Sequence, residues 1–268
     1  MVIKTNKDTD YLYHRLSILL TQSGLSFLYL KGNKINKEKY FKIKASNKYS
    51  EETELIIAEE LHQIKEATLD EVVLIYQNID YNLIPNKLTE GVNSILHASK
   101  YNLSLQAEDD FSQDSSFNNQ ISVSFVPLIN INNLIFDRFG EFNHTHQTNL
   151  YLKAAETYKS AFSDCICFVN NHQVDIVIIK KQKLQLYNTF KISTEEDVIY
   201  YILYCLEINE INREAIETII VNFSDQLKLK QINSLLEPYV KHISIKDFAK
   251  ASSNPHLSNH KFLNELCV

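Results

Sequence analysis

The stretch CICFVNNHQVDIVIIKKQKLQLYNTF, residues 165–190, has the pattern of three consecutive β-strands. Its apolar runs are separated by polar turns at 170–173 and 180–183, and short apolar runs bounded by turn residues are typical of buried strands. Turns this short join antiparallel neighbours. We therefore predict an antiparallel three-stranded meander, and the elements that follow it decide the fold class.

Helices and strands alternate after this meander. Thr194 is a good helix N-cap, and either Ser193 with Glu196 or Thr194 with Asp197 has the spacing of a capping box. A meander that continues into α/β crossovers predicts a mixed sheet covered by helices. The expected elements are a helix over 193–208, a strand over 215–223, a helix over 225–240 and a strand over 241–248.

The first half of the chain repeats this order. The stretch SILLTQSGLSFLYLKGN, residues 17–33, contains two apolar runs around Gln22-Ser23-Gly24. We predict strands over 16–22, 25–30, 39–44 and 70–78, and helices over 50–66 and 88–100. A polar loop over 106–120, a strand that ends at Pro127, a short helix stopped by Gly140 and a helix over 149–162 complete this half. The expected domains are an N-terminal lobe over 10–150, a C-terminal lobe over 151–250 and a loosely packed polar tail over 251–268.

Composition narrows the class of protein. The chain has 268 residues and a formal net charge of −6, which argues against nonspecific binding of nucleic acid, because that binding depends on Lys and Arg neutralising phosphates. No apolar stretch is long enough to predict a transmembrane helix, and no membrane insertion is expected. The four cysteines form no CxxC motif, so reduced thiols in the cytoplasm are the expected setting.

The repeated order of elements resembles that of actin-like ATPases, the α/β, ribonuclease-H-like fold of actin, Hsp70 chaperones and sugar kinases. The stretches LSILLTQSGLSF, YNLIPNKL, HTHQTNLYLKAAE and NTFKISTEEDVIYYILY also resemble a bacterial family, the domain of unknown function 3822 family. This resemblance implies a two-lobed actin-like fold with a mixed sheet and helices in each lobe. The pattern is also similar to the actin homologue of pilus assembly, a cytoplasmic scaffold that binds a peptide of its partner.

Actin-like ATPases hold nucleotide with three sequence elements. Two hairpin turns, one in each lobe, resemble Asp-x-Gly-x-x-Thr/Ser, in which the Asp holds Mg²⁺ and the Gly lets backbone N–H groups face the phosphates. The third element is a Gly-Gly pair after a later strand. With only 4 glycines in the chain, few positions suit such loops.

All three elements are altered in this sequence. In the first hairpin Thr21 stands where the Asp is expected, although Ser23, Gly24 and Ser26 retain a small residue and hydroxyl groups. In the second hairpin Asn170 takes the Asp position, Asn171 follows it, and Asp175 lies on the next strand. The third element is represented by Ser224-Asp225-Gln226-Leu227, without glycine. We therefore interpret Ser23, Gly24, Ser26, Asn170 and Asn171 as a degenerate nucleotide site, with no catalytic residue and no bound metal.

Five other groups of residues have a functional and a structural interpretation. His144 and His146 are either metal ligands or part of a polar segment before a helix, and Cys165 and Cys167 are either reactive or buried core thiols. Tyr200, Tyr201 and Tyr204 suit an aromatic recognition surface or a core helix equally well. The basic run 180–183 fits a solvated hairpin tip, and Asp109, Asp110 and Asp114 fit a disordered acidic loop.

The expected function is that of a non-catalytic actin-like pseudo-ATPase, a cytoplasmic scaffold or adaptor without a cofactor. Its protein partner would bind in the inter-lobe cleft or at a sheet edge. The alternative is a divergent nucleotide-binding protein or ATPase of the same superfamily, with ATP as its cofactor. A third hypothesis, an accessory protein that binds RNA or DNA, is disfavoured by the net charge, and no nucleic-acid partner is expected.

Overall fold

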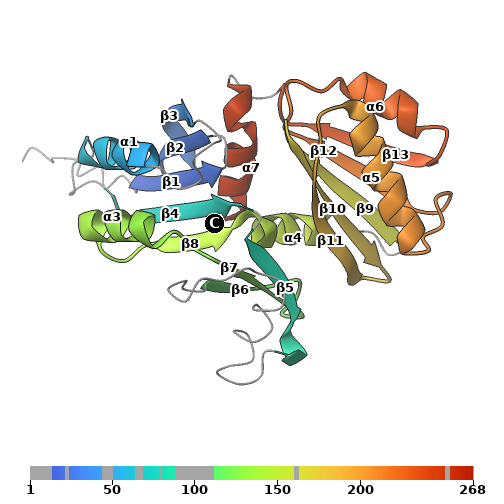
Figure 1. Cartoon of the computed structure of the whole chain (residues 1–268), viewed down its shortest axis with the longest axis horizontal. Coiled ribbons are helices and arrows are strands. Elements are labelled where there is room, and N and C mark those ends of the chain that lie inside the picture. Colours follow the sequence, from blue (N-terminus) through green and yellow to red (C-terminus); the bar gives the residue numbers. More distant parts are fainter. Residues whose placement is uncertain are drawn as a thin grey trace, which may run out of the picture. The chain divides into compact units, whose positions relative to one another are not determined.

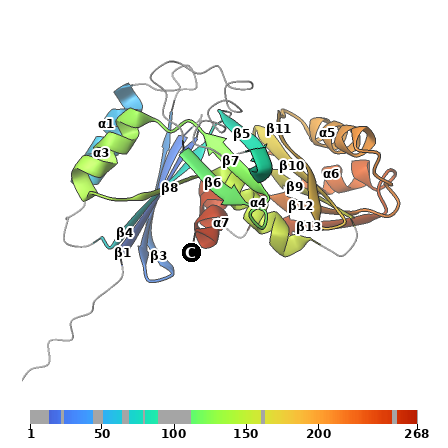
Figure 2. The same cartoon turned by 90° about the horizontal axis from the view of Figure 1, so that it is seen from below.

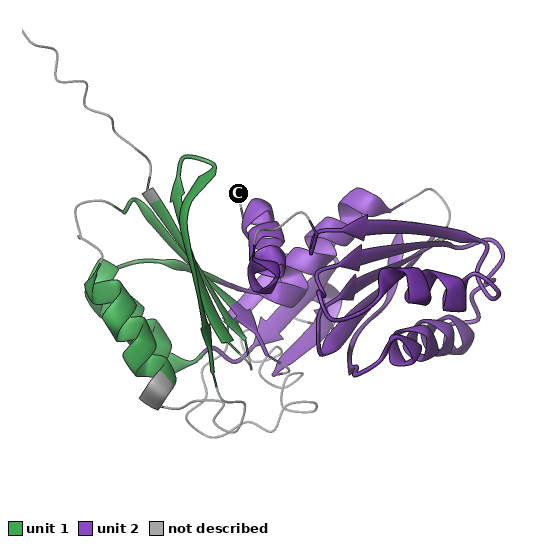
Figure 3. Ribbon diagram, turned by 90° about the horizontal axis from the view of Figure 1, so that it is seen from above, with its two compact units in different colours: residues 1–75, 128–144 green, residues 76–127, 145–268 purple. Residues whose placement is uncertain are grey.

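The structure is a computed structural model that describes residues 14–21, 24–43, 51–63, 69–78, 80–88, 112–159, 163–250 and 254–267. The chain divides into two compact units (Figure 3), of which unit 1 comprises residues 1–75 and 128–144 and unit 2 comprises residues 76–127 and 145–268. These units do not coincide with the lobes expected over 10–150 and 151–250, whose boundaries stay a prediction.

Unit 1 is built around a five-stranded sheet with the strand order β3-β2-β1-β4-β8. Strand β1 pairs antiparallel with β2, and β2 pairs antiparallel with β3, so the expected meander is confirmed. Strand β8, whose sequence is NHTH, was not predicted because it is short and polar. The strands are β1 (His14–Thr21), β2 (Gly24–Lys31), β3 (Lys34–Lys42), β4 (Glu71–Gln77) and β8 (Asn143–His146).

Two helices, α1 (Glu51–His62) and α3 (Ile129–Phe139), pack against each other in unit 1 (Figures 1 and 2). Apolar residues at helical spacing turn inward, and Ile57 and Ile135 are fully buried. Helix α3 ends at Gly140, whose φ of 76° is a backbone conformation that glycine adopts without strain. The two helices predicted from the sequence pattern in this unit are therefore confirmed.

Unit 2 contains a second five-stranded sheet, with the order β11-β10-β9-β12-β13. In each sheet the first strand of the meander is central and its third strand forms one edge. The two later strands of the sheet lie on the other side of the central strand. Strand β12 is parallel to β9, and β13 is parallel to β12. The repeated order expected from the sequence is therefore confirmed. The strands are β9 (Ser163–Val169), β10 (Gln173–Lys180), β11 (Lys183–Lys191), β12 (Glu217–Asn222) and β13 (His242–Asp247).

Helices pack on both faces of this second sheet (Figure 1). Residues Cys165, Cys167 and Val169 of β9 join the core under α5 (Glu195–Ile208) and α6 (Leu229–Leu236). On the opposite face of β9, the ring of Phe168 stacks on that of Tyr151 in α4 (Gln147–Tyr158), with 4.0 Å between centroids. Burial on both faces explains why β9 is apolar from Cys165 to Val169 instead of alternating.

The segment after residue 253 is part of this packing, so the expectation of a loosely packed tail is wrong. Residues Pro255–Leu257 form the 3-10 helix η3, and Ser258–Leu266 form helix α7. The ring of Phe262 lies 5.1 Å from that of Phe223, and Tyr151 donates a hydrogen bond of 2.8 Å to Asn259. The tail looked exposed in sequence because several of its buried residues are polar, and their partners come from distant segments.

A small antiparallel sheet with the order β5-β7-β6 also belongs to unit 2. It comprises β5 (Tyr81–Pro85), β6 (Ser112–Ser116) and β7 (Ile121–Phe125), and the 3-10 helix η2 (Asn86–Leu88) follows β5. Strand β6 lies within the expected loop over 106–120, so that expectation is wrong for its residues. The helix expected over 88–100 lies outside the described residues apart from Leu88.

Candidate functional site

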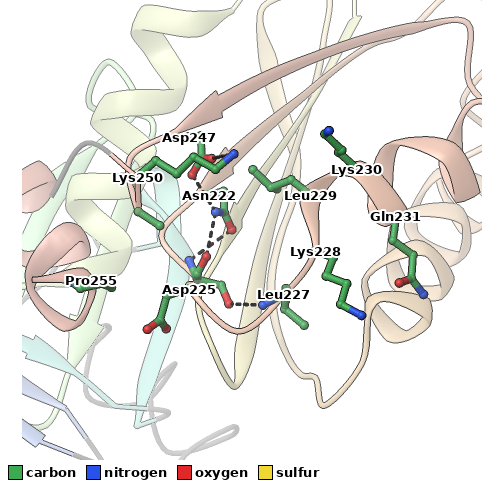
Figure 4. Close-up of a pocket in the computed structure, with 12 residues that line it drawn as sticks. Asn222, Asp225, Leu227, Lys228, Leu229, Lys230, Gln231, Asp247, Lys250 and Pro255 are labelled. Carbon is green, nitrogen blue, oxygen red and sulfur yellow. Dashed lines mark hydrogen bonds and ion pairs between the residues drawn. The ribbon is translucent and has the colours of Figure 1, made fainter.

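The parallel strands of the second sheet end at one edge, where polar residues gather. Asn170 follows β9, Asn222 is the last residue of β12, and Asp247 is the last residue of β13. Open α/β sheets bind ligands outside the carboxyl ends of their strands. A pocket of about 660 Å³ lies here (Figure 4), lined by Asn222, Ser224, Asp225, Leu227, Lys228, Leu229, Lys230, Gln231, Asp247, Ala249, Lys250 and Pro255.

Asn222 holds the ends of β12 and β13 together at the floor of this pocket. Its side-chain amide donates hydrogen bonds of 2.9 Å to the carbonyl of Ser224 and of 3.0 Å to Oδ1 of Asp247. Its own Oδ1 accepts a bond of 3.2 Å from the backbone N–H of Ser224. Lys250 forms an ion pair with Asp247 at 3.1 Å. Both ends of the Asn222 amide are therefore engaged within the protein.

The loop that replaces the Gly-Gly element uses its backbone N–H groups internally. Those of Gln226 and Leu227 donate to Oγ of Ser224 at 3.2 and 3.1 Å. The N–H of Lys228 donates to a carboxylate oxygen of Glu195 at 2.8 Å, and this bond lowers the pKa of Glu195. A phosphate-binding loop instead presents its N–H groups to the anion. In this loop, at the position of the third nucleotide element, the N–H groups of Gln226, Leu227 and Lys228 are thus bonded within the protein.

The second hairpin turn reaches this loop directly. The side-chain amide of Asn171 donates a hydrogen bond of 3.0 Å to Asp225. The backbone N–H of Asn170 donates to the carbonyl of Gln173 at 2.9 Å, and the Asn170 side chain donates to the hydroxyl of Tyr151 at 3.1 Å. The structure therefore brings the second and third elements together, with amides where a metal-binding carboxylate is expected.

Packing in the first hairpin explains why residue 24 is a glycine. Oγ1 of Thr21 bonds both the backbone N–H and the carbonyl of Gly24, each at 2.9 Å. A Cβ on Gly24 would lie 2.6 Å from Cε2 and from the hydroxyl oxygen of Tyr40. Ser26 is buried within β2, and Ser23 lies outside the described residues. The one N–H that Gly24 offers is thus bonded to the threonine that replaces the expected Asp.

A buried carboxylate, Asp175, lies two residues beyond the second turn on β10. Its Oδ1 accepts bonds from Tyr187 at 2.9 Å and Thr189 at 2.6 Å, and its Oδ2 accepts a bond of 2.9 Å from Gln173. Burial raises the pKa of Asp175 to about 6. The hydroxyl groups of Tyr81 and Thr189 are 2.8 Å apart, which extends the network. The sequence signal for this group is a lone Asp inside the apolar run VDIVII.

The two histidines considered as metal ligands are His144, whose ring lies 5.8 Å from that of Phe142, and His146. His146 is the N-cap of α4, and its Nδ1 accepts a bond of 3.2 Å from the N–H of Thr148. Its Nε2 lies 3.2 Å from the carbonyl of Asn78, and burial lowers its pKa to about 3. With both ring nitrogens engaged, His146 is a capping residue. No group of three potential metal ligands occurs among the residues that the structure describes.

The cysteine pair is part of the core. The sulfur atoms of Cys165 and Cys167 are 3.7 Å apart and buried. The neighbouring Cys165 thiol and burial raise the pKa of Cys167 well above its ordinary value, which disfavours a reactive thiolate. The interpretation of these residues as core thiols is confirmed.

The charged runs are structural too. Lys181 and Gln182 form the exposed tip of the β10–β11 hairpin, so the interpretation of 180–183 as a hairpin tip is confirmed. Asp114 lies on β6 and accepts a bond of 2.5 Å from Thr145, so its assignment to a disordered loop is wrong. Asp109 and Asp110 lie outside the described residues.

Comparison with protein families assigns the chain. The profile described as "Protein of unknown function (DUF3822)" matches residues 4–243. The chain belongs to the DUF3822 family. No curated protein matches it.

Two solved structures show the fold of this DUF3822 protein. A Bacteroides thetaiotaomicron protein with an actin-like ATPase fold and unknown function is similar with a TM-score of 0.75 and 17% identity, over 97% of this chain and 99% of that chain. The PilM–PilN type IV pilus biogenesis complex is similar with a TM-score of 0.57 and 12% identity, over 95% and 98% of the two chains. The expected actin-like ATPase fold is thus confirmed. In the described part of the chain, no helix is long and apolar enough to cross a membrane.

Proposed function

We propose that this DUF3822 protein is a non-catalytic actin-like pseudo-ATPase that works as a cytoplasmic scaffold or adaptor for a protein partner and needs no cofactor. The observation that carries the proposal is the internal use of the groups that would receive a phosphate. Gly24 donates to Thr21, Asn170 donates to Gln173, and Lys228 donates to Glu195. A nucleotide would have to displace these bonds.

The missing metal-binding carboxylates of the two hairpins support the same proposal. Phosphoryl transfer depends on a metal ion and on positive groups that stabilise charge spread over the phosphate oxygens. Thr21 and Asn170 are neutral at the two positions where actin-like ATPases carry an Asp. The carboxylates that do line the pocket, Asp225 and Asp247, accept bonds from Asn171 and Asn222. They are placed to hold the protein together, and the pocket is also lined by Lys228, Lys230 and Lys250.

A protein partner is supported by the PilM–PilN structure, in which a protein of this fold assembles with another protein. The partner is expected to bind in the inter-lobe cleft or at a sheet edge. In unit 2, β13 is an edge strand, and its Ile245 is among the exposed large apolar residues. An exposed strand edge offers unpaired backbone groups to an added strand.

Thermal unfolding with nucleotide tests the proposal. The protein is heated without ligand, with millimolar Mg-ATP, and with ATP in EDTA. Ligand at 100 times its Kd stabilises a folded protein by about 2.7 kcal/mol, which raises Tm by several degrees for a chain of this size. We expect no shift in either nucleotide sample. A reproducible rise in Tm with Mg-ATP would show that the pseudo-ATPase proposal is wrong.

The pocket favours one alternative, a nucleotide-binding protein that holds ATP without metal-dependent hydrolysis. A volume of about 660 Å³ is within the range of small-molecule sites, and Leu227 and Leu229 provide apolar walls. This alternative predicts a rise in Tm with ATP that survives EDTA. Leu229→Trp, which fills the pocket, would abolish that rise, whereas Tyr239→Ser, outside the pocket lining, would keep it.

A further inference from the structure

Helix α5 exposes three large apolar side chains along one face. Tyr200, Tyr204 and Ile208 follow one another at intervals of four residues, which places them on the same side of a helix. Their side chains are 61%, 44% and 54% exposed. We call these three residues the α5 stripe. Single exposed apolar residues are common, but a continuous row on one element marks an interaction surface.

The stripe contributes nothing to the core of unit 2. The opposite face of α5 carries the buried residues Val198, Ile202 and Leu206, which pack with the strands of the second sheet. Between the two faces, Tyr201 stacks on Phe190 of β11 with 4.3 Å between ring centroids. Core packing therefore accounts for Tyr201 and leaves Tyr200 and Tyr204 unexplained.

The two exposed rings are already arranged for contact. Those of Tyr200 and Tyr204 are stacked at 6.0 Å with an interplanar angle of 10°, and Tyr200 also meets Tyr201 edge-on at 5.2 Å. The helix beneath them begins with a complete capping box, in which Thr194 and Asp197 bond each other's backbone N–H groups. Tyrosines on a rigid helix lose little conformational entropy on binding, and they are enriched among the residues that dominate interface energies.

The charges that helix α5 itself carries are negative. Helix α5 has Glu195, Glu196, Asp197 and Glu207 and no Lys or Arg. Glu196 precedes Tyr200 by four residues and Glu207 follows Tyr204 by three, so both acids border the stripe. Glu207 pairs with Arg213 at 3.0 Å, but exposed pairs of this kind contribute little and exchange readily. A tyrosine ring face also attracts cations.

We propose that the α5 stripe docks a basic amphipathic segment of a protein partner, with Lys or Arg side chains set against the tyrosine rings and acidic rim, and aliphatic side chains on Ile208. The inference rests on the adaptor function proposed above and names the chemistry of the partner. A second copy of this chain is a poorer occupant, because pairing two α5 helices would bring their acidic residues together. The same charge disfavours nucleic acids and anionic lipids.

Fluorescence anisotropy with two synthetic peptides tests this proposal. The probe is a labelled amphipathic peptide of Leu-Lys-Lys-Leu repeats, and its counterpart has Glu in place of every Lys. We expect saturable binding of the lysine peptide to the wild-type chain and none of the glutamate peptide. Tyr200→Ser/Tyr204→Ser should weaken binding of the lysine peptide at least tenfold, because both rings are lost.

Two further variants separate the stripe from general electrostatic attraction. Tyr239→Ser removes a tyrosine that is 52% exposed but lies outside α5, and it should leave the Kd within twofold of wild type. Glu196→Lys keeps every ring and reverses one charge at the rim, so it should weaken binding of the lysine peptide severalfold. This variant tests the proposal even if the double variant folds poorly. No binding to the wild type, equal loss with Tyr239→Ser, or a wild-type dimer that the double variant abolishes would each overturn the proposal. None of these results changes the nucleotide assay, so the two proposals fail separately.

Discussion

The ring of Tyr40 lies across Gly24, at a distance that leaves no room for a side chain there. Strands β2 and β3 pair Ser26 with Tyr40, and Gly24 is the next residue on that face, so the two are diagonal neighbours across the hairpin. A Cβ on Gly24 would meet Cε2, Cζ and the hydroxyl oxygen of Tyr40 at 2.6 to 2.8 Å. An aromatic ring that covers a glycine of the adjacent strand is a known way to stabilise such a position.

Gly24→Ala is expected to destabilise the protein by about 1–3 kcal/mol, because the Tyr40 ring must move out of its place. Urea unfolding of the single variant, of Tyr40→Leu and of the double variant measures the coupling. The loss in free energy of unfolding caused by Gly24→Ala should fall by more than half when Tyr40 is replaced by Leu. A cost that stays the same in both backgrounds would mean that the glycine serves something other than packing.

Asn222→Asp is expected to destabilise the protein more than Asn222→Ala does. The alanine variant loses the bonds to Ser224 and Asp247, at a cost of about 1–3 kcal/mol. The aspartate variant also sets a buried carboxylate against Asp247, and a buried charge facing a like charge costs several kcal/mol. Urea unfolding at pH 7 and at pH 5 checks both. The difference in free energy of unfolding between Asn222→Asp and Asn222→Ala should be smaller at pH 5, because a protonated carboxyl group donates a hydrogen bond as the amide does.

Much of the fold could be predicted because apolar runs bounded by turn residues indicate most strands of both five-stranded sheets. The β10 run VDIVII and the capping residues of α5 are local signals, and they identified their elements correctly. Strands β6 and β8 and helix α7 were missed because their polar side chains bond residues distant in sequence. Thr145, for example, donates to Asp114, and Tyr151 donates to Asn259. No local pattern reveals such partners.

The candidate site was predictable in position and not in its contacts. The repeated order of elements located the turn at Asn170 and the loop at Ser224, and the bond from Asn171 to Asp225 joins them. The reason for Gly24 was hidden, because the ring that covers it depends on the register of β2 and β3. A register shift between Tyr29 and Leu30 sets that alignment, and sequence periodicity does not show a shift of one residue.

Asp175 and His146 should give stability opposite dependences on pH. The pKa of Asp175 is raised from 3.8 to about 6, so between these values the folded chain holds a proton that the unfolded chain releases. Its contribution to stability therefore increases as pH falls from about 6 to about 4. The pKa of His146 is lowered from 6.5 to about 3, so the unfolded chain takes up the proton first. Its contribution is lost as pH falls from about 6.5 to about 3.

Single substitutions should separate these opposing effects. Asp175→Asn keeps an oxygen for Tyr187 and Thr189, and the Gln173 amide can turn to accept from the new amide. This variant should lose stability more steeply than wild type between pH 6 and 4, by up to about 3 kcal/mol at about 1.4 kcal/mol for each pH unit. His146→Asn retains a capping oxygen. As pH falls from 6 to 4, this variant should become more stable relative to wild type, because it lacks the loss that His146 causes. Urea unfolding at four pH values tests both, and parallel curves for the three proteins would contradict the assignment.

The tip of the β10–β11 hairpin is expected to be a site where stability can be increased. Lys181 and Gln182 form a two-residue turn with φ values of 51° and 62°, a left-handed conformation that costs most residues about 1–2 kcal/mol. Asn-Gly is the favoured pair in a turn of this kind. Lys181→Asn/Gln182→Gly should therefore raise the free energy of unfolding by about 1–2 kcal/mol, measured by urea unfolding. Lys183→Asn, just outside the turn, changes the same charge without relieving strain and should give no increase. An equal gain in that control would assign the effect to charge.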